Sequence, residues 1–481
     1  MDPKNNNRRD FLKLTSLSGM GLVGAQFITG CANSEAQSTE SEDSVVKLAQ
    51  RKYNQSFNMC GYGAPAIPTV RIGFVGLGSR GPGAVKRMSY LEGVEIKALC
   101  DVRPEQAQAA KDLLKGTNHD PELYTDGEDA WKMMCQREDL DLIYIATPWS
   151  LHTPMAVYAM EQGKHAATEV PAATTLEECW QLVETSERTK KHCCILENCC
   201  YDFFELLTLN MARQGYFGEI FHGEGAYIHD ILDAFGSRKR FNSWRLRQNM
   251  DRRGNLYPTH GLGPICQIMN VNRGDKMDYL TSTSTNDFMM AAKVKELAAE
   301  DESFAEFDGK EFRGNMNTSV VKTHQGKTIM IQHDVSSPRP YSRIHLISGT
   351  KGAARKWPLP GKIALGHEGW HSEEEMKKIE EQYTPEMVKL LGDMARKAGG
   401  HGGMDFLMDW RLIDCLRHGL PLDHDVYDAA SWSAIFPLSE WSVNNRSAPI
   451  DFPDFTGGAW ENNAPVDKSL KNGVSTGVVI S

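Results

Sequence analysis

The sequence predicts an α/β protein in which an N-terminal domain with a parallel sheet precedes a C-terminal α+β domain with a mainly antiparallel sheet. Three observations predict this architecture: a glycine-rich string between a strand and a helix, an alternation of strands and helices up to about residue 196, and a succession of strands without helices after it. The length of 481 residues and the hydrophobic content of 41% are sufficient for two packed domains.

Short apolar runs rich in β-branched residues alternate with helix-like segments in the first third of the chain. Strands are expected at 70–75, 94–100 and 140–146, and helices at 82–91, 105–114 and 127–136. Strands that alternate with helices at this spacing form βαβ units, which build a parallel sheet.

A G-x-G-x-x-G string joins the first expected strand to the first expected helix. Gly76 would permit the tight turn, Gly78 would let the backbone approach a pyrophosphate, and Gly81 would let helix and strand pack. Asp101 ends the next strand and would accept hydrogen bonds from ribose hydroxyls, while its charge repels a 2′-phosphate. The context predicts a Rossmann dinucleotide-binding domain that prefers NAD to NADP, a preference that the nearby Arg103 weakens.

In the second half of the chain, strands no longer alternate regularly with helices. Strands are expected in close succession at 220–227, 279–285, 318–323, 328–334 and 343–348, with a Gln325-Gly326 turn between two of them. A partly helical covering segment is expected at 366–402, a helix at 404–417, and a Trp-rich closing stretch up to 443. The predicted boundaries are 1–31 for an export signal, 32–67 for a tether and N-terminal arm, 68–196 for the dinucleotide-binding domain, 197–455 for a substrate-binding domain and 456–481 for a tail.

The N-terminus has the order of an export signal. The pair Arg8-Arg9 precedes a short apolar stretch at 14–28 that resembles a twin-arginine signal and is too short to span a bilayer. Cys31 follows Ile28-Thr29-Gly30 as in a lipoprotein cleavage box, and the segment up to about Ser44 has the composition of a disordered tether. We expect a periplasmic protein or a membrane-anchored lipoprotein, whose membrane contact is a lipid on Cys31; the alternative is a chance arginine pair.

Charge and cysteine usage exclude several other classes. A formal net charge of -10 without a basic stripe argues against nucleic acid as a partner. The pairs Cys193-Cys194 and Cys199-Cys200 lack the spacing of zinc knuckles, so buried free thiols are expected and no metal site. His367-Glu368-Gly369-Trp370-His371 matches the H-E-x-x-H zinc-protease pattern, but its glycines and the extended 362–365 run before it disfavour the required helix.

The region 72–171 contains the glycine string, Ala146-Thr147-Pro148 with His152, and Gly163-Lys164-His165 leading to Glu169-Val170-Pro171. In these motifs it resembles the glucose-fructose oxidoreductase/inositol dehydrogenase (Gfo/Idh/MocA) family. Dehydrogenases of that family carry Glu-Lys-Pro in the last string, and their lysine helps proton transfer. Val170 replaces this lysine here, so an ordinary family dehydrogenase is disfavoured.

A narrower set of strings comprises Glu169-Val170-Pro171, Glu197-Asn198, Tyr227, Trp244-Arg245-Leu246-Arg247 and Tyr257-Pro258-Thr259-His260-Gly261. With these strings the chain resembles, from about residue 58 to 455, the α-N-acetylgalactosaminidases of glycoside hydrolase family 109. The resemblance implies that NAD contacts Gly76, Gly78, Ser79, Arg80, Gly81, Asp101, Trp149, Ser150, Leu151, His152, Glu169, Val170, Asn198 and Tyr257. It implies a sugar site of Tyr227, Arg245, Tyr257, Pro258, Thr259, His260 and Tyr341.

The same resemblance implies hydrolysis of terminal α-N-acetylgalactosamine from a glycan or glycoconjugate, by an NAD-dependent cycle of oxidation, elimination, addition and reduction. His260 would be the base for the C3 hydroxyl, because imidazole titrates near working pH, and Arg245 would bind the sugar. Either Tyr227 or Tyr257 would take the C2 proton or polarise the ketone. Export agrees with this cycle, because a reaction without net redox change needs no pool of NAD.

Other interpretations remain open. Taken singly, His152 and His260 could be core histidines, Tyr227 could pack in its strand, and Arg245 could be a surface charge. The alternative function is an exported Gfo/Idh/MocA-type sugar oxidoreductase, and a further one is a non-catalytic sugar-binding protein. An exposed antiparallel sheet would also allow a homodimer.

Overall fold

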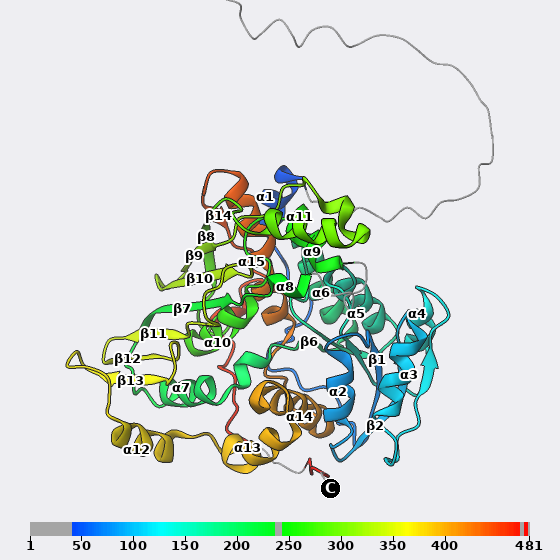
Figure 1. Ribbon diagram of the computed structural model, residues 1–481. Helices are drawn as coiled ribbons and strands as arrows, with labels where there is room; N and C mark the ends of the chain where they lie inside the picture. The colour runs from blue at the N-terminus through cyan, green and yellow to red at the C-terminus, as the bar shows by residue number, and fades with distance from the viewer. Residues whose placement is uncertain (1–40, 236–242, 472–475, 480–481) are drawn as a thin grey trace, which may run out of the picture. The chain divides into compact units, whose positions relative to one another are not determined.

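The computed structural model describes residues 41–235, 243–471 and 476–479 (Figure 1). The predicted export signal, Cys31 and most of the predicted tether lie outside these residues. Helix α1 (Glu42–Ala49) begins earlier than the tether was expected to end, because the Ser41 side chain accepts a hydrogen bond from the Ser44 backbone N–H and caps it. Within the described residues, no helix is long and apolar enough to cross a membrane.

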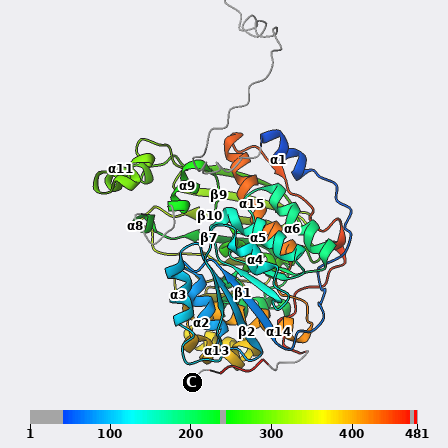
Figure 2. The same ribbon diagram turned by 90° about the vertical axis from the view of Figure 1, so that its right-hand side faces the viewer.

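The N-terminal part is a parallel sheet, as predicted, and it has six strands in the order β3-β2-β1-β4-β5-β6. Its strands are β1 Val70–Val75, β2 Val94–Cys100, β3 Glu122–Tyr124, β4 Leu142–Ile145, β5 His165–Thr168 and β6 Cys193–Ile195. Its helices are α2 Gly81–Met88, α3 Pro104–Asp112, α4 Ala130–Cys135, α5 His152–Glu161 and α6 Leu176–Thr189, and Figure 2 shows them beside these strands. Every residue of β4 is buried, because helices cover both faces of a parallel sheet.

The sequence analysis did not identify β3, β5 and β6. Each has only three or four residues, which is too short for a periodic pattern to be recognised. Helix α4 begins three residues later than expected, and the other predicted strands and helices of this part lie where they were expected, within a few residues.

The C-terminal part is an eight-stranded sheet of order β13-β12-β11-β7-β10-β9-β8-β14. The strands are β7 Ile220–Ile228, β8 Met277–Ser284, β9 Asn317–Thr323, β10 Thr328–Asp334, β11 Leu346–Gly349, β12 Gly352–Arg355, β13 Lys362–Leu365 and β14 Ile450–Asp451, and Figure 1 shows β7 to β13 side by side. Six of the seven neighbouring pairs are antiparallel, and the β7–β10 pair is parallel. The sheet is therefore mixed, with the antiparallel majority that the sequence predicted.

One expected strand was placed too early. The prediction began at residue 343, but Ile344 and His345 have positive φ angles of 59° and 47°, and β11 begins at Leu346. Two successive residues in the left-handed region turn the chain and interrupt an extended strand. The H-E-x-x-H segment follows β13 and is not helical, with positive φ angles at Gly366 and Gly369, as its glycines indicated.

Two long buried helices join the sheets into one compact unit. Helix α14 (Met404–His418) packs on α2 and β1, and helix α15 (Val426–Asn444) packs on α6 and β8. The other helices are α7 Phe203–Arg213, α8 Leu232–Phe235, α9 Trp244–Asp251, α10 Thr259–Met269, α11 Met290–Glu300, α12 Glu373–Tyr383 and α13 Glu386–Ala398. Helix α10 packs on β7 and α14 packs on β1, and both helices also pack on the 3₁₀ turn Asn198–Tyr201, which links the two sheets.

The cysteines give a first testable prediction. All ten cysteines of the described residues are free thiols, nine of them buried, as expected. Only Cys60 is half-buried, and burial raises the pKa of its thiol. We expect thiol titration of the native protein at neutral pH to detect at most one of these ten thiols, reacting slowly, and all ten after unfolding in guanidinium. Rapid labelling of several thiols in the native protein would contradict these buried positions.

Candidate functional site

The glycine loop between β1 and α2 has the shape that the sequence predicted. Gly76 has a φ angle of +87°, and a Cβ there would lie 2.6 Å from the backbone of Ala146 at the end of β4. A Cβ on Gly81 would lie 2.1 Å from the carbonyl oxygen of Gly76. These two positions require glycine for the turn and for helix–strand packing. A Cβ on Gly78 would contact only the Arg103 guanidinium, at 3.0 Å.

Asp101 lies beside this loop and stabilises it through hydrogen bonds to its carboxylate. One carboxylate oxygen accepts a hydrogen bond from the Leu77 backbone N–H at 2.7 Å, and the other accepts from the Arg103 backbone N–H at 2.9 Å. The carboxylate thus lies at the end of β2, where the ribose of a dinucleotide is expected.

Three predicted cofactor residues, Arg80, Glu169 and Asn198, belong to one hydrogen-bond network. The network contains Asp405, which the sequence analysis did not identify. Arg80 donates to Glu169 at 2.9 Å and to Asp405 at 3.2 Å, and Asn198 donates to Asp405 at 2.5 Å. Burial acts to raise the pKa of Asp405, but the hydrogen bond with His401 and the charge of Arg80 outweigh it and hold the pKa well below its usual range. Asp405, in the first turn of α14, therefore links the glycine loop to the C-terminal part.

The segment after β4 carries four of the predicted cofactor residues. Trp149–Leu151 form a 3₁₀ turn, in which Trp149 is buried, Ser150 is half-buried and Leu151 is exposed. His152 is buried, with Nδ1 2.7 Å from the carbonyl oxygen of Pro171 and Nε2 2.8 Å from that of Thr147.

Burial also lowers the pKa of His152. With both ring nitrogens against backbone carbonyls, the geometry favours a structural histidine that orders this loop and the buried Val170 beside Pro171, over direct contact of its ring with a cofactor.

An aromatic cluster connects the cofactor end to the predicted sugar end. Tyr257 stacks on Trp149 at 5.7 Å between ring centroids, and it contacts Tyr227 at 4.7 Å and His260 at 4.9 Å. Tyr341 contacts Tyr227 from another side, at 6.4 Å. The buried Pro258 and Thr259 start α10, which presents His260 to this cluster.

Arg245 belongs to the same cluster and is not a solvated surface charge. Its guanidinium lies 5.0 Å from the Tyr257 ring centroid and 5.2 Å from that of Trp149. Its Nη2 atom is buried and has no hydrogen-bond partner among the described residues. A buried guanidinium nitrogen without an acceptor costs free energy, and an incoming carbonyl or hydroxyl oxygen would supply that acceptor.

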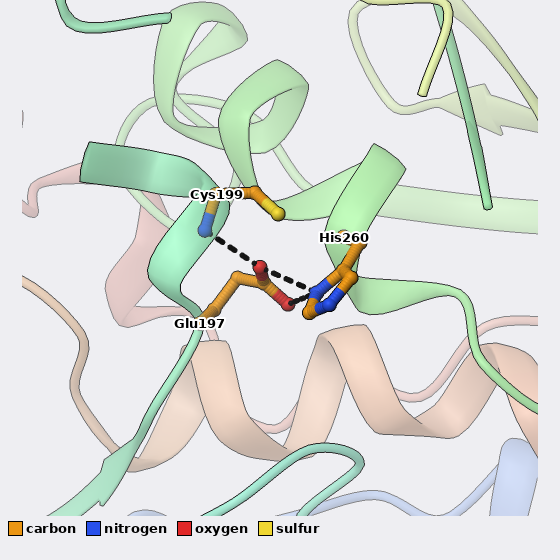
Figure 3. A group of neighbouring side chains, drawn as sticks. All are labelled: Glu197, Cys199 and His260. Atoms are coloured by element: carbon orange, nitrogen blue, oxygen red, sulfur yellow. Dashed lines mark hydrogen bonds and ion pairs between the residues drawn. The ribbon is translucent and has the colours of Figure 1, made fainter. Parts of the chain in front are cut away.

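His260 is held by a carboxylate that was not among the predicted site residues. Its Nδ1 lies 2.8 and 3.0 Å from the two oxygens of Glu197, which is fully buried, and Figure 3 shows the carboxylate aimed at the ring. Burial acts to raise the pKa of Glu197, but the adjacent His260 outweighs it and lowers the pKa to about 2. A carboxylate at Nδ1 fixes the tautomer with the proton on Nδ1 and leaves Nε2 as a proton acceptor.

Glu197, Cys199 and His260 together could hold a metal ion, since their ligand atoms lie within 4.8 Å of one another. Other features of the group favour a carboxylate–histidine pair. Glu197 already accepts from His260 and from the Cys199 backbone N–H at 3.0 Å, and burial raises the pKa of the Cys199 thiol, which keeps it protonated. A thiol binds metals as the thiolate.

The sequence contained partial signals for the missed residues. Glu197 is part of the Glu197-Asn198 string, and His229 lies two residues after Tyr227, just past the end of β7, a spacing that places side chains on the same face in extended chain. The Tyr227 hydroxyl lies 2.8 Å from Nδ1 of His229. No local pattern pointed to Asp405, which meets Asn198 across 207 residues.

A dinucleotide loop that adjoins a histidine–carboxylate pair, three tyrosines and an unpartnered guanidinium defines a dinucleotide-dependent enzyme. The family model "Oxidoreductase family, NAD-binding Rossmann fold" matches residues 70–196, and "Glycosyl hydrolase 109, C-terminal domain" matches residues 201–462.

Two relatives identify the family, and one solved structure shares the fold. A glycosyl hydrolase family 109 protein of Porphyromonas gingivalis is 50% identical over 82% of this chain and 86% of its own length. An alpha-N-acetylgalactosaminidase of Bacteroides fragilis is 49% identical over 84% of this chain and 96% of its own length. Levoglucosan dehydrogenase in complex with NADH shares the fold, with a TM-score of 0.61, 16% identity and coverage of 80% of this chain and 99% of its own. The chain belongs to glycosyl hydrolase family 109: it is a glycoside hydrolase, and NAD is its cofactor.

Proposed function

We propose that this glycoside hydrolase removes terminal α-linked N-acetylgalactosamine from glycans or glycoconjugates, with NAD retained through a cycle without net redox change. The observation that carries the proposal is the position of Tyr257, whose ring contacts Trp149 beside the NAD-binding loop and also contacts Tyr227 and His260. A sugar in this cluster would lie next to the cofactor. The relative named alpha-N-acetylgalactosaminidase supports the choice of sugar.

The described residues fit NAD. The loop has no room for side chains at Gly76 and Gly81, and Gly78 leaves backbone open for a pyrophosphate. Ser79 and Arg80 would hold the phosphates, Asp101 the ribose, and Trp149 and Glu169 the nicotinamide end. When bound, NAD supplies a hydride acceptor for C3 of the sugar and a hydride donor at the end of the cycle.

The side chains of the aromatic cluster and His260 would accept the protons that the sugar releases from its C3 hydroxyl and from C2. His260, with Nδ1 held by Glu197, accepts the C3 hydroxyl proton at Nε2. The 3-keto sugar has an acidic C2–H, and Tyr227 or Tyr257 accepts that proton as the bond between C1 and the leaving oxygen breaks. Water then adds at C1, and a proton returns to C2. The unpartnered Nη2 of Arg245 would bind the N-acetyl oxygen.

Export fits this cycle and is part of the proposal. Arg8-Arg9 and the Cys31 box support passage through a twin-arginine route to the periplasm or to a lipid anchor. A glycosidase that regenerates its own cofactor needs no supply of NAD after export.

The test uses the NAD-loaded protein and nitrophenyl α-N-acetylgalactosaminide in deuterated water. We expect release of nitrophenol together with deuterium at C2 of the free sugar, because the C2 proton exchanges with solvent during elimination. Release without deuterium at C2 would show direct displacement. Formation of an oxidised sugar without nitrophenol would instead show a sugar oxidoreductase, which Val170 in the lysine position disfavours.

A further inference from the structure

A second proton-handling pair lies beside the His260–Glu197 pair. Tyr227 and His229 lie on and just after the end of β7, two residues apart, so both side chains point to the same face. The Tyr227 hydroxyl lies 2.8 Å from Nδ1 of His229. The His229 backbone N–H donates to the carbonyl of Asp334 at 2.9 Å, which anchors the residue at the end of β10.

The two members of this pair differ in their exposure to solvent. Tyr227 is 8% exposed, and its ring is enclosed by Tyr257 at 4.7 Å and His260 at 5.4 Å. His229 is half-buried, with its ring against Tyr341 at 4.9 Å. His229 is therefore the member of the pair that meets solvent, while Tyr227 faces the site.

The surroundings of His229 favour its neutral imidazole. Burial lowers the pKa of His229, and the nearby Arg245 and His260 lower it further. A neutral imidazole that accepts a hydrogen bond at Nδ1 can receive the hydroxyl proton of the residue bonded to it.

We propose that His229 is a positioning residue that accepts the Tyr227 hydroxyl proton while the Tyr227 oxygen accepts the C2 proton of the bound sugar. This inference rests on the proposed function and selects Tyr227 over Tyr257 for the C2 step. No described residue accepts a hydrogen bond from the Tyr257 hydroxyl, whereas Tyr227 has His229 at 2.8 Å.

Each proton and each electron pair displaced in this step has an acceptor. The C2–H proton moves to the Tyr227 oxygen as the Tyr227 proton moves to Nδ1 of His229, and the electron pair of C2 forms the C1–C2 double bond as the leaving oxygen departs. While the double bond exists, the Tyr227–His229 pair exchanges its protons with solvent through the half-buried His229, so C2 receives a solvent proton when water adds. C2 and C3 are neighbouring carbons, which requires two separate acceptors side by side. The His260–Glu197 and Tyr227–His229 pairs supply them, with 5.4 Å between the Tyr227 and His260 rings.

The kinetic test follows exchange of C2–H in free N-acetylgalactosamine with deuterated solvent, using NAD-loaded protein. His229→Asn keeps a hydrogen-bond acceptor for Tyr227 but takes no proton, so we expect exchange to fall about 100-fold with KM little changed. Exchange within about threefold of the wild-type rate in His229→Asn would show that His229 does not accept the Tyr227 proton, and it would overturn the proposal. In His229→Ala, added imidazole should restore part of the exchange, and failure to do so counts against proton acceptance.

His222→Asn is the matched control. His222 is also a half-buried histidine of β7, but its Nδ1 lies 2.8 Å from the Thr328 hydroxyl, outside the site. We expect wild-type exchange in this variant. An equal loss in both variants would indicate general damage to β7 and overturn the assignment.

A second readout does not depend on activity. ¹⁵N NMR of histidine-labelled protein should show Nδ1 of His229 unprotonated in the wild type, with its signal moved by Tyr227→Phe. A proton on Nδ1 would overturn the proposal. If wild-type protein shows no exchange at C2 while this tautomer is found, the proposed function fails and the hydrogen bond stands; normal exchange in His229→Asn defeats only the inference.

Discussion

Replacing His260 by alanine is expected to lower kcat by about 10⁴-fold while NAD still binds with wild-type affinity. The physical reason is that His260 is the group that receives the C3 hydroxyl proton, and its Nδ1 is committed to Glu197 at 2.8 Å. The NAD-binding loop lies on a different element, between β1 and α2. Steady-state hydrolysis of the nitrophenyl glycoside and calorimetric titration of NAD measure the two quantities separately.

Glu197→Gln is the companion to this variant. It keeps the size of the side chain but removes the charge that stabilises a protonated imidazole, so we expect a smaller loss of about 10²-fold. Activity of His260→Ala within tenfold of wild type would show that another group takes the hydroxyl proton. A fall of NAD affinity equal to the fall of kcat would show that the substitution disturbs the whole site.

Gly81→Ala is expected to have the second largest effect, a loss of NAD affinity of about 100-fold. A Cβ at residue 81 would lie 2.1 Å from the Gly76 carbonyl oxygen, so α2 must move away from β1, at a cost of about 1–3 kcal/mol. The same movement displaces the backbone N–H groups that face the pyrophosphate. Calorimetric titration of NAD gives the affinity, and the rise of Tm on adding NAD gives an independent measure.

Gly83→Ala is the matched control in the same helix. A Cβ there would meet only the far end of the Arg87 side chain at 3.1 Å, and alanine favours helix more than glycine does. We expect NAD affinity close to wild type. If Gly81→Ala binds NAD as tightly as Gly83→Ala does, the packing of α2 on β1 does not set the affinity.

The position of Asp405 explains how the catalytic site and the cofactor site keep a fixed position relative to each other. Its carboxylate accepts from Arg80 on the glycine loop and from Asn198, which is next to Glu197. Arg87 of α2 also pairs with Asp409, one turn along α14, at 2.7 Å. These contacts tie the loop that holds NAD to the segment that orients His260, and the buried Arg87–Asp409 pair is little screened by solvent.

The sequence predicted well those features that local backbone chemistry controls. The strand β1, the turn at Gly76 and the helix α2 follow from an apolar β-branched run, a residue that accepts positive φ, and the start of a helical pattern. The Gln325-Gly326 hairpin between β9 and β10 was found for the same reason, with a φ angle of 86° at Gly326. Short strands such as β6, with three residues, gave no periodic pattern.

Features that depend on distant partners were not predictable in this way. The parallel pairing of β7 with β10 depends on how the chain returns after β9, and the interruption before β11 depends on positive φ angles at Ile344 and His345, residues without a turn signal. The surroundings of His152 were not predictable either, because its two ring nitrogens lie against the carbonyl oxygens of Pro171 and Thr147.

By itself the sequence determined the dinucleotide loop and the longer strands, and its motif strings carried the family resemblance that named Tyr227, Arg245, Tyr257 and His260, because periodicity, glycine positions and motif strings are properties of neighbouring residues. The tertiary structure alone decided that Glu197 holds His260 across 63 residues, that Asp405 meets Asn198 across 207, and that His229 lies at the solvent side of Tyr227. Such contacts arise when helices and sheets pack, and the packing brings together side chains whose separation in the chain carries no local conformational signal.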